Sequence, residues 1–231
     1  QASDRIRNDP ELVSILLEHN PYILKHCSPA IIKNTKIVRK SIRASPCTFL
    51  HADPSFLSNK AVAVYCIEMC LQKYRSWCPF NLYHHLDPIL KMDQDIIRLT
   101  LRYKAETLYD IPTDLPFYRE VVMEFLEINP RYIEYLSTPY LDDKDIIHHY
   151  IRHHYDCGIW FLYVSDRLRN NVDTVKLFLK HSELGLKYVG RQAKRNMDIL
   201  KFSLLRNSNN FHFVPVRYRK DQTLINLALD G

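Results

Sequence analysis

One apolar pattern recurs along this chain every 25 residues, and it constrains the fold more than any other feature. Apolar pairs begin at Leu12, Ile37, Val62, Ile96, Val121, Ile146, Thr174 (paired with Val175), Ile199 and Leu224. Six of the eight successive intervals are 25 residues long. The other two intervals, of 34 and 28 residues, contain insertions of nine and three residues, after which the register resumes. A fixed period of this length is typical of arrays of stacked repeats.

Each period begins with the pattern of an amphipathic helix. Counted as offsets from the first residue of the pair, apolar side chains recur at 0, 1, 4 and 5, which is one face of an α-helix. A capping residue precedes the pair at Asp9, Asn34, Asn59, Asp93, Asp143 and Asn196. Proline follows Asn20, Ser45 and Asn129, where it disfavours helical geometry in the residue before it. These signals predict where the first helix of each repeat begins and ends.

A second apolar set at offsets 12, 15 and 19, such as Ile133, Leu136 and Tyr140, predicts a second short helix. Offset 16 is small or helix-breaking, which predicts a kink or a close approach between helices; its residues are Ser28, Asp53, Asp87, Pro112, Ser137, Ser165, Gly190 and Pro215. Helices this short are marginal alone in water, so we expect each repeat to stack on its neighbours.

The predicted fold class is therefore all-α: a right-handed α-solenoid of about nine 25-residue two-helix repeats, the last one partial. We expect a single helical-repeat domain over residues 1–231, with repeats starting near residues 8, 34, 59, 92, 117, 143, 171, 196 and 221.

Composition excludes several other classes of protein. Only 4 glycines are present, and neither a dinucleotide-binding nor a phosphate-binding glycine motif occurs. The six cysteines form no CxxC pair, which indicates buried, reduced thiols in an intracellular protein. No apolar run is long enough to span a bilayer, and the chain opens with neither Met nor a signal peptide. We expect a soluble fragment from the cytoplasm, or from the host cytoplasm if it is an effector.

The repeats resemble those of the family called domain of unknown function 4116. The segment around residues 143–168 carries the family's opening D-x-[DE]-[IV]-[IV] and its later L-x-x-[AV]-S-x-x-L pattern, through Asp143, Asp145, Ile146, Ile147, Phe161, Val164, Ser165 and Leu168. Glu120, Val121, Val122, Ile133, Leu136, Ser137 and Leu141 match as well. The resemblance covers most of the chain and implies an interaction array without catalytic residues. Such repeats occur in proteins of amoebae, large amoebal viruses and intracellular bacteria that inject effectors.

Basic residues recur at offsets 2 and 6, one turn apart beside the apolar face of the first helix. This predicted basic ridge contains Arg39, Arg43, Arg98, Arg102, Arg152, Lys176, Lys180 and Lys201, with His148 beside Arg152. Glu18, Glu68 and Glu127 interrupt it, so the alternative is a solvated face with ion pairs between repeats.

Positive charge also gathers toward the end of the chain. Residues 176–220 contain eleven Lys or Arg against Glu183 and Asp198, a net charge of +9 in a chain whose total is +6. This asymmetry predicts an acidic partner, with contacts at Arg191, Lys194, Arg195, Arg217, Arg219 and Lys220. Ordinary solubility explains such a surface about as well.

The histidines around residue 150 are a candidate metal site. His149 and His153 share a helix face, with Asp145 one turn earlier. A closed site needs further ligands from another repeat, and no base of the H-E-x-x-H type lies between them, so we predict no metal and favour a pH-sensitive polar face.

The nine-residue insertion carries Trp77, Phe80, Tyr83, His84 and His85, which either form an exposed aromatic anchor or fill a gap between repeats. We slightly prefer the second.

Taken together, the residues predict a non-catalytic scaffold for protein–protein interaction, with no cofactor. The alternatives are a binder of nucleic acid or anionic lipid through the basic C-terminal surface, and a histidine-centred metalloprotein. The oligomeric state and the identity of the partner are open at this point.

Overall fold

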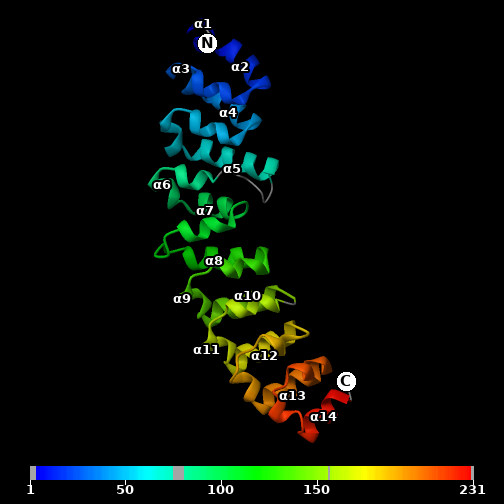
Figure 1. The fold of residues 1–231 in the computed structure, drawn as a ribbon. Coiled ribbons are helices and arrows are strands. Elements are labelled where there is room, and N and C mark those ends of the chain that lie inside the picture. The colour runs from blue at the N-terminus through cyan, green and yellow to red at the C-terminus, as the bar shows by residue number, and fades with distance from the viewer. Residues whose placement is uncertain (1–3, 75–80, 156, 230–231) are drawn as a thin grey trace. The chain divides into compact units, whose positions relative to one another are not determined.

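The computed structural model describes residues 4–74, 81–155 and 157–229, and every regular element in these ranges is a helix (Figure 1). No strand occurs among these described residues, which confirms the predicted all-α class. The chain divides into two compact units, Gln1–Tyr118 and Arg119–Gly231, and each is described by itself.

The first compact unit alternates α-helices with 3₁₀-helices. Its elements are α1 (Asp4–Asn8), α2 (Pro10–His19), η1 (Pro21–His26), α3 (Pro29–Ile32), α4 (Thr35–Ala44), η2 (Pro46–His51), η3 (Pro54–Ser58), α5 (Lys60–Tyr74), η4 (Leu82–His85), α6 (Pro88–Lys91), α7 (Gln94–Leu101) and η5 (Ala105–Asp110). Successive long helices pack on one another, α2 on α4, α4 on α5 and α5 on α7.

The second compact unit has the same alternation. It contains α8 (Tyr118–Ile128, beginning at the boundary), η6 (Pro130–Tyr135), α9 (Thr138–Leu141), α10 (Lys144–His153), η7 (Ile159–Tyr163), α11 (Asp166–Arg169), α12 (Val172–His181), η8 (Gly185–Lys187), η9 (Ala193–Arg195), α13 (Met197–Arg206), η10 (Ser208–Phe213), η11 (Val216–Tyr218) and α14 (Gln222–Leu229). Here α10 packs on α12, α12 on α13, and α13 on α14.

The long helices begin where the capping residues predict. The side chains of Asp9, Asn34, Asp93, Asp143 and Asn196 each accept hydrogen bonds from two amides of the first turn of their helix. The structure also confirms the predicted ends of α2 and α4, which stop at the residue before Asn20 and before Ser45. In the same way α13 stops at the residue before Asn207. Local side-chain chemistry thus sets both ends of these helices.

In most predicted repeats the second half differs from the single short helix that we expected. It holds a 3₁₀-helix followed by a separate short helix, as in η1 and α3. The break falls at offset 16, where Ser28, Asp53, Asp87, Ser137 and Ser165 have extended backbones and precede the short helix. Proline directly follows Ser28, Asp53 and Asp87, and it fits the first turn of the new helix because that turn needs no amide donor there. The predicted kink is therefore a complete interruption.

The same offset carries a recurring hydrogen bond. In the first compact unit the amides of Asp53 and Asp87 donate to the carbonyls of Ile32 and Leu57, both at 3.1 Å. In the second, Ser165 donates to Leu141 at 3.0 Å and Gly190 donates to Arg169 at 2.8 Å. Each bond joins one predicted repeat to the one before it. Small residues at offset 16 allow the close approach that these bonds require.

The apolar faces of the long helices form the core. In α10, Ile146, Ile147, Tyr150 and Ile151 are fully buried. Burial raises the pKa of Tyr150, and its hydroxyl donates to the carbonyl of Pro130 at 2.9 Å. The corresponding Ser41 donates to the carbonyl of Pro21 at 3.0 Å. In these two repeats a buried polar group at offset 4 therefore satisfies a carbonyl of the preceding predicted repeat, whereas Thr100 and Ser203 at the same offset donate to carbonyls of their own helix.

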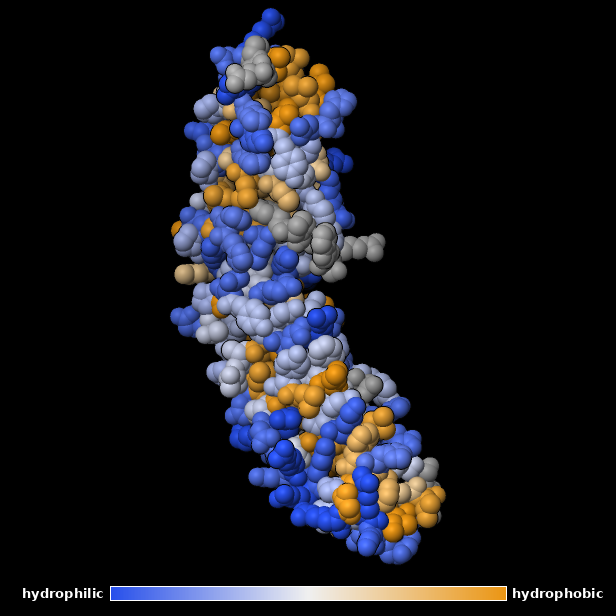
Figure 2. Space-filling model, viewed as in Figure 1, coloured by the Kyte–Doolittle hydropathy of each residue, from blue (hydrophilic) through white to orange (hydrophobic). Residues whose placement is uncertain are grey.

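One apolar face stays exposed in the first compact unit. Hydrophobic side chains gather over α2 in Figure 2, where Leu12, Ile15 and Leu16 are exposed.

The two insertions affect the structure in different ways. In the third predicted repeat α5 is 15 residues long, against 10 for α4. In the sixth, residues 154–158 separate α10 from η7, whereas Ser45 alone separates α4 from η2. The offset-16 bonds of Asp87 and Ser165 are nevertheless kept.

Candidate functional site

A basic hollow lies in the second compact unit, close to the C-terminal end of the chain. Its lining residues are Arg191, Lys194, Arg195, Pro215, Val216 and Arg217, and its volume is about 370 Å³. They come from two segments, the one that contains η9 and the one that leads from Pro215 into η11. Four of the six side chains are cationic, and none is acidic.

Lys194 is the most enclosed of the four cations. Its ammonium donates to the carbonyl of Lys187 at 2.8 Å. Burial lowers the pKa of Lys194, and the neighbouring Arg169 lowers it further. Removing a cation from water and placing it near another cation both disfavour its charged form. An anion entering the hollow would offset both effects.

Arg217 is held in place by an aromatic ring. Its guanidinium lies 4.4 Å from the centroid of the Tyr218 ring, and it also donates to the Tyr218 hydroxyl at 2.6 Å. That hydroxyl in turn donates to the carbonyl of Arg195 at 3.1 Å. Between these cations Val216 is 76% exposed, so the hollow combines positive charge with an uncovered apolar side chain.

Two residues of the predicted C-terminal basic surface lie outside this lining. Arg219 donates to the carbonyls of Val214 and His212, both at 2.9 Å, which occupies its guanidinium with backbone groups. Lys220 is exposed. The structure therefore brings together four of the six predicted residues: Arg191, Lys194, Arg195 and Arg217.

The predicted basic ridge falls in both compact units. In the first, Arg39 lies 5.5 Å from the centroid of the Tyr65 ring, Arg43 and Arg102 are exposed, and Arg98 is half-buried. Arg39 therefore contacts the next helix as well as solvent.

In the second compact unit, Lys176 lies 6.0 Å from the centroid of the Phe202 ring. Arg152 is exposed and Lys201 is half-buried. Lys176 of α12 thus sits beside an aromatic side chain of the neighbouring helix α13.

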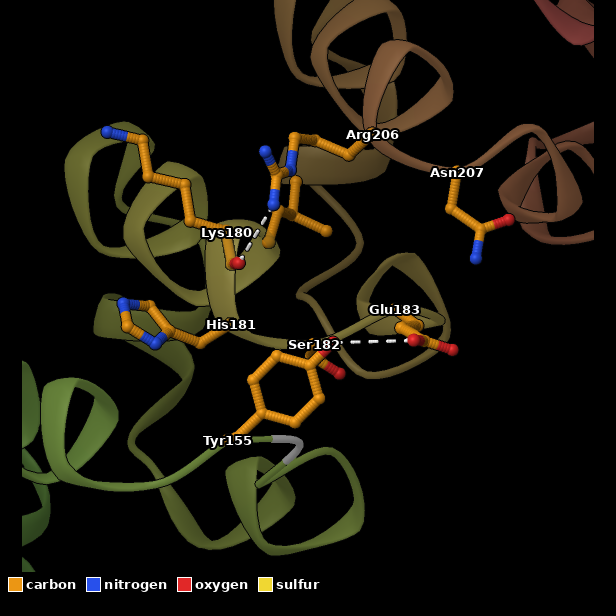
Figure 3. A pocket seen from close by; sticks show the side chains of 8 residues that line it. Tyr155, Lys180, His181, Ser182, Glu183, Arg206 and Asn207 are labelled. Atoms are coloured by element: carbon orange, nitrogen blue, oxygen red, sulfur yellow. Dashed lines mark hydrogen bonds between the residues drawn. The ribbon is translucent and has the colours of Figure 1, made fainter. Parts of the chain in front are cut away.

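Lys180 lines a second, polar hollow of about 220 Å³ (Figure 3). There Arg206 donates to the carbonyl of Lys180 at 3.2 Å, and the Tyr155 hydroxyl donates to Glu183 at 3.3 Å. Burial lowers the pKa of His181, with a further contribution from Lys180. Because Glu183 and the cations share this hollow, its charge is mixed.

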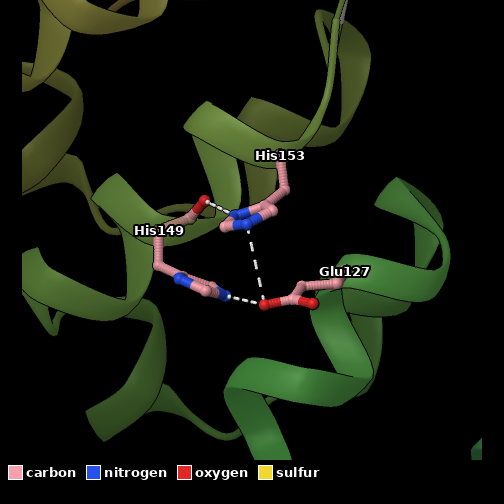
Figure 4. A group of neighbouring side chains, drawn as sticks. All are labelled: Glu127, His149 and His153. Carbon is pink, nitrogen blue, oxygen red and sulfur yellow. Dashed lines mark hydrogen bonds and ion pairs between the residues drawn. The ribbon is translucent and has the colours of Figure 1, made fainter.

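The histidine cluster is placed as predicted, but its acidic neighbour is a different residue. Asp145 is 87% exposed and pairs with Arg119 at 3.6 Å. Instead Glu127, from α8, reaches His149 and His153 of α10 (Figure 4). Sequence reasoning treated Glu127 only as an interruption of the basic ridge and missed this contact. An equivalent pair of offsets in an earlier repeat could have indicated it. Glu18 at the same offset pairs with Lys40, the counterpart of His149, at 2.7 Å.

Tyr83 and His84, which follow the part of the insertion that the structure does not describe, both have defined partners. Tyr83 is buried, its hydroxyl donates to the carbonyl of Lys91 at 2.8 Å, and burial raises its pKa to about 12. His84 lies 2.7 Å from Asp110. Trp77 and Phe80 lie outside the described residues.

The thiols follow the prediction in part. Cys66, Cys70 and Cys157 are buried, and Cys27 and Cys47 are half-buried. Burial raises the pKa of Cys27. Cys78 lies outside the described residues.

Comparisons with family models, with curated proteins and with solved structures return no match for this chain. Among the described helices, none combines the length and the apolar character needed to cross a membrane.

Proposed function

We propose that the chain is a non-catalytic helical-repeat scaffold that binds an acidic segment of another protein in its basic hollow. The scaffold part of this proposal is an α-solenoid of stacked 25-residue repeats, in line with the resemblance to the domain of unknown function 4116 family. The binding part concerns Arg191, Lys194, Arg195 and Arg217.

Three recurring contacts support the repeat architecture. The first is the offset-16 amide bond to the preceding repeat, as from Asp53 to Ile32 and from Ser165 to Leu141. The second is the offset-4 bond to a proline carbonyl.

The third contact joins the starts of successive long helices. Lys144 pairs with Asp173 at 3.1 Å, and Lys60 pairs with Asp95 at 2.7 Å. Equivalent positions in these repeats therefore make equivalent contacts, which is what stacking of like repeats requires.

The observation that carries the binding proposal is the exposed Val216 among the four cations. A peptide can meet both features at once, with carboxylates on the arginines and one apolar side chain on Val216 and Pro215. Charge complementarity would favour the encounter, and burial of Val216 would stabilise the complex. Phosphate alone would leave the apolar side chain exposed.

A nucleic acid fits this hollow less well. Single strands bind on aromatic rings that stack with their bases, but the Tyr218 ring is already in contact with the guanidinium of Arg217. Protein is therefore the better-supported partner, and nucleic acid or anionic lipid becomes an outcome of the test.

The test measures the fluorescence anisotropy of short labelled ligands with the whole chain. The ligands are a glutamate-rich peptide with one leucine, the same peptide with serine in place of leucine, and an oligothymidylate of equal charge. Vesicles with and without phosphatidylserine are tested by co-sedimentation. We expect the leucine-containing peptide to bind most tightly.

The charge-reversal variant Arg191→Glu/Arg195→Glu should weaken binding of that peptide at least about tenfold. Val216→Ser should remove its preference for leucine over serine. Lys220→Glu/Arg43→Glu is the matched control, because it makes the same change of charge at exposed residues outside the hollow. Tighter binding of the oligonucleotide or of anionic vesicles, or an equal loss in the control, would overturn the proposal.

A further inference from the structure

Three side chains that commonly bind metal ions converge in the second compact unit (Figure 4). Glu127 comes from the last turn of α8, and His149 and His153 lie one turn apart on α10. One ligand atom from each residue lies within 4.8 Å of the other two. The nearest oxygen of Glu127, Oε1, is 2.9 Å from Nε2 of His149 and 3.6 Å from Nε2 of His153.

These separations suit a tetrahedral ion. With zinc bonds of about 2.0–2.1 Å, two ligand atoms of one tetrahedral ion lie about 3.3 Å apart. The two measured distances lie on either side of that value. Small rotations of the side chains would therefore bring all three atoms to bonding distance of a common point.

The ring of His153 is already oriented for binding. Its Nδ1 lies 2.9 Å from the carbonyl oxygen of His149, which can only accept a hydrogen bond. Nδ1 must therefore carry the proton as donor, and Nε2 of the neutral ring keeps its lone pair. A metal-binding histidine is commonly fixed in this way by a backbone carbonyl.

His149 supplies the second observation. Its Nε2 is buried and makes no hydrogen bond among the described residues, although Oε1 of Glu127 is only 2.9 Å away. The two atoms are thus close without being aligned for a hydrogen bond. Buried polar atoms rarely lack a partner, and a shared cation would satisfy this one.

The contact follows from the stacking of repeats. Glu127 and His149 occupy the same relative positions as Glu18 and Lys40, whose side chains pair at 2.7 Å. In the earlier pair lysine supplies the positive charge itself. In the later pair two imidazoles take its place beside the carboxylate, and imidazole nitrogens and a carboxylate oxygen can share a divalent cation.

We propose that Glu127, His149 and His153 bind Zn²⁺. Two imidazole nitrogens and a carboxylate oxygen are a donor set that zinc accepts, whereas Mg²⁺ and Ca²⁺ prefer oxygen ligands alone. Three protein ligands leave the fourth position to water. The ion would join α8 to α10, two consecutive long helices, and so reinforce their packing. This inference departs from the sequence prediction of no metal site and is independent of the basic hollow.

The test is calorimetric titration of the whole chain with zinc chloride, after treatment with a chelator and in a phosphine reductant that keeps thiols reduced. We expect one Zn²⁺ per chain and a higher midpoint of thermal unfolding with zinc than without it. Co²⁺ should give the visible absorption of a tetrahedral site, and Mg²⁺ should give no heat of binding.

The variants Glu127→Gln, His149→Gln and His153→Gln should each weaken zinc binding at least about tenfold, since even losses among the partners of ligands cost that much. His148→Gln is the matched control, because His148 lies on the same helix but contacts Thr174 at 2.9 Å. His153→Gln should leave the fold intact, because that side chain is 43% exposed, so a loss of zinc binding in this variant would reflect the lost ligand. Circular dichroism confirms the fold of each variant.

Zinc held by cysteine thiols would persist in the double variant Glu127→Gln/His149→Gln. The proposal is overturned if the wild-type chain binds no zinc, if the double variant binds it as tightly as the wild type, or if His148→Gln is as damaging as His149→Gln.

Discussion

Asp143 performs two tasks at the start of α10. Its Oδ1 accepts hydrogen bonds from the amides of Asp145 at 2.9 Å and Ile146 at 3.1 Å. The same carboxylate binds the guanidinium of Arg119 from α8. The hydrogen bond from Arg119 lowers the pKa of Asp143 more than burial raises it. One side chain therefore caps a helix and ties it to the previous one.

Asp143→Asn separates these two tasks, because asparagine caps helices well but carries no charge. A lowered pKa in the folded state means that the pairing stabilises the fold above the unfolded pKa, near 3.9, and is lost as pH falls through the folded pKa. We expect the variant to be less stable at pH 7 by about 0.5–1 kcal/mol, since Arg119 is half-exposed. The difference should shrink as pH falls below the unfolded pKa and vanish once pH is below the lowered pKa of the folded state.

Urea unfolding of both proteins across this pH range measures the effect. A difference that stays constant with pH would show that the cap, and not the charge, accounts for it.

At the scale of residues, the sequence predicts the role of a side chain whose partners lie a few positions away along the chain. The capping residues were predicted correctly because a cap needs only a short polar side chain a few positions from its amides. The partner of His149 was not, because Glu127 reaches it only through the stacking of two helices. The sequence pattern shows the offset of each residue within its repeat. It does not show which offsets of two neighbouring helices come into contact.

At the scale of elements, the junction between α11 and η9 shows how tightly two predicted repeats meet. A Cβ on Gly190 would lie 2.1 Å from Oδ1 of Asn170. That oxygen accepts hydrogen bonds from the amides of Gln192 at 2.9 Å and Ala193 at 3.0 Å. Glycine is thus required here for space.

Gly190→Ala should destabilise the chain by about 1–3 kcal/mol, because Asn170 must move and give up both hydrogen bonds. Asn170→Gly removes the obstacle. In the double variant the loss should therefore be clearly smaller than the sum of the two single losses. Chemical denaturation of all four proteins completes the cycle, and additive losses would contradict the steric explanation.

The element types themselves were only partly predictable. Apolar periodicity identified the long helices, because their buried face spans several turns. It could not distinguish one short helix from a 3₁₀-helix followed by a separate turn, as in η6 and α9, because both place Ile133 and Leu136 toward the core. The break between the two helices is marked by the extended backbone of Ser137 and by the proline two positions after it.

At the scale of the whole molecule, long helices that follow one another within a compact unit pack together, as α4 does on α5 and α12 on α13. Leu200 of α13 is fully buried, and α13 packs on α12 and α14. Stability in such an arrangement is a sum of neighbour contributions, so damage should stay near its origin.

Leu200→Ala should lower the free energy of local unfolding by about 2–5 kcal/mol. Hydrogen exchange of the amides in α12, α13 and α14 should therefore be faster. Exchange in α2 and α4 should change little. Mass spectrometry of deuterated peptides measures both regions. Leu205→Ala is the control, because Leu205 lies on the same helix but is 70% exposed. Uniform acceleration along the chain would indicate a single cooperative unit.

The predicted function belongs to this scale too. The sequence indicated where positive charge gathers, and the structure places four of those residues around Val216. It could not indicate the hollow, because Arg191 and Arg217 are brought together only by the packing of separate segments. The scaffold role and the family resemblance stay predictions.

The two insertions have a practical consequence. The third predicted repeat has a longer helix, α5, and the sixth has a longer connection between α10 and η7, yet the amides of Asp87 and Ser165 still reach Leu57 and Leu141. Turn length and repeat contact are therefore separable, and the entropic cost of a longer turn grows slowly. An engineer could graft an epitope or a fluorescent reporter between α4 and η2, which only Ser45 separates, and leave the neighbouring helices in register.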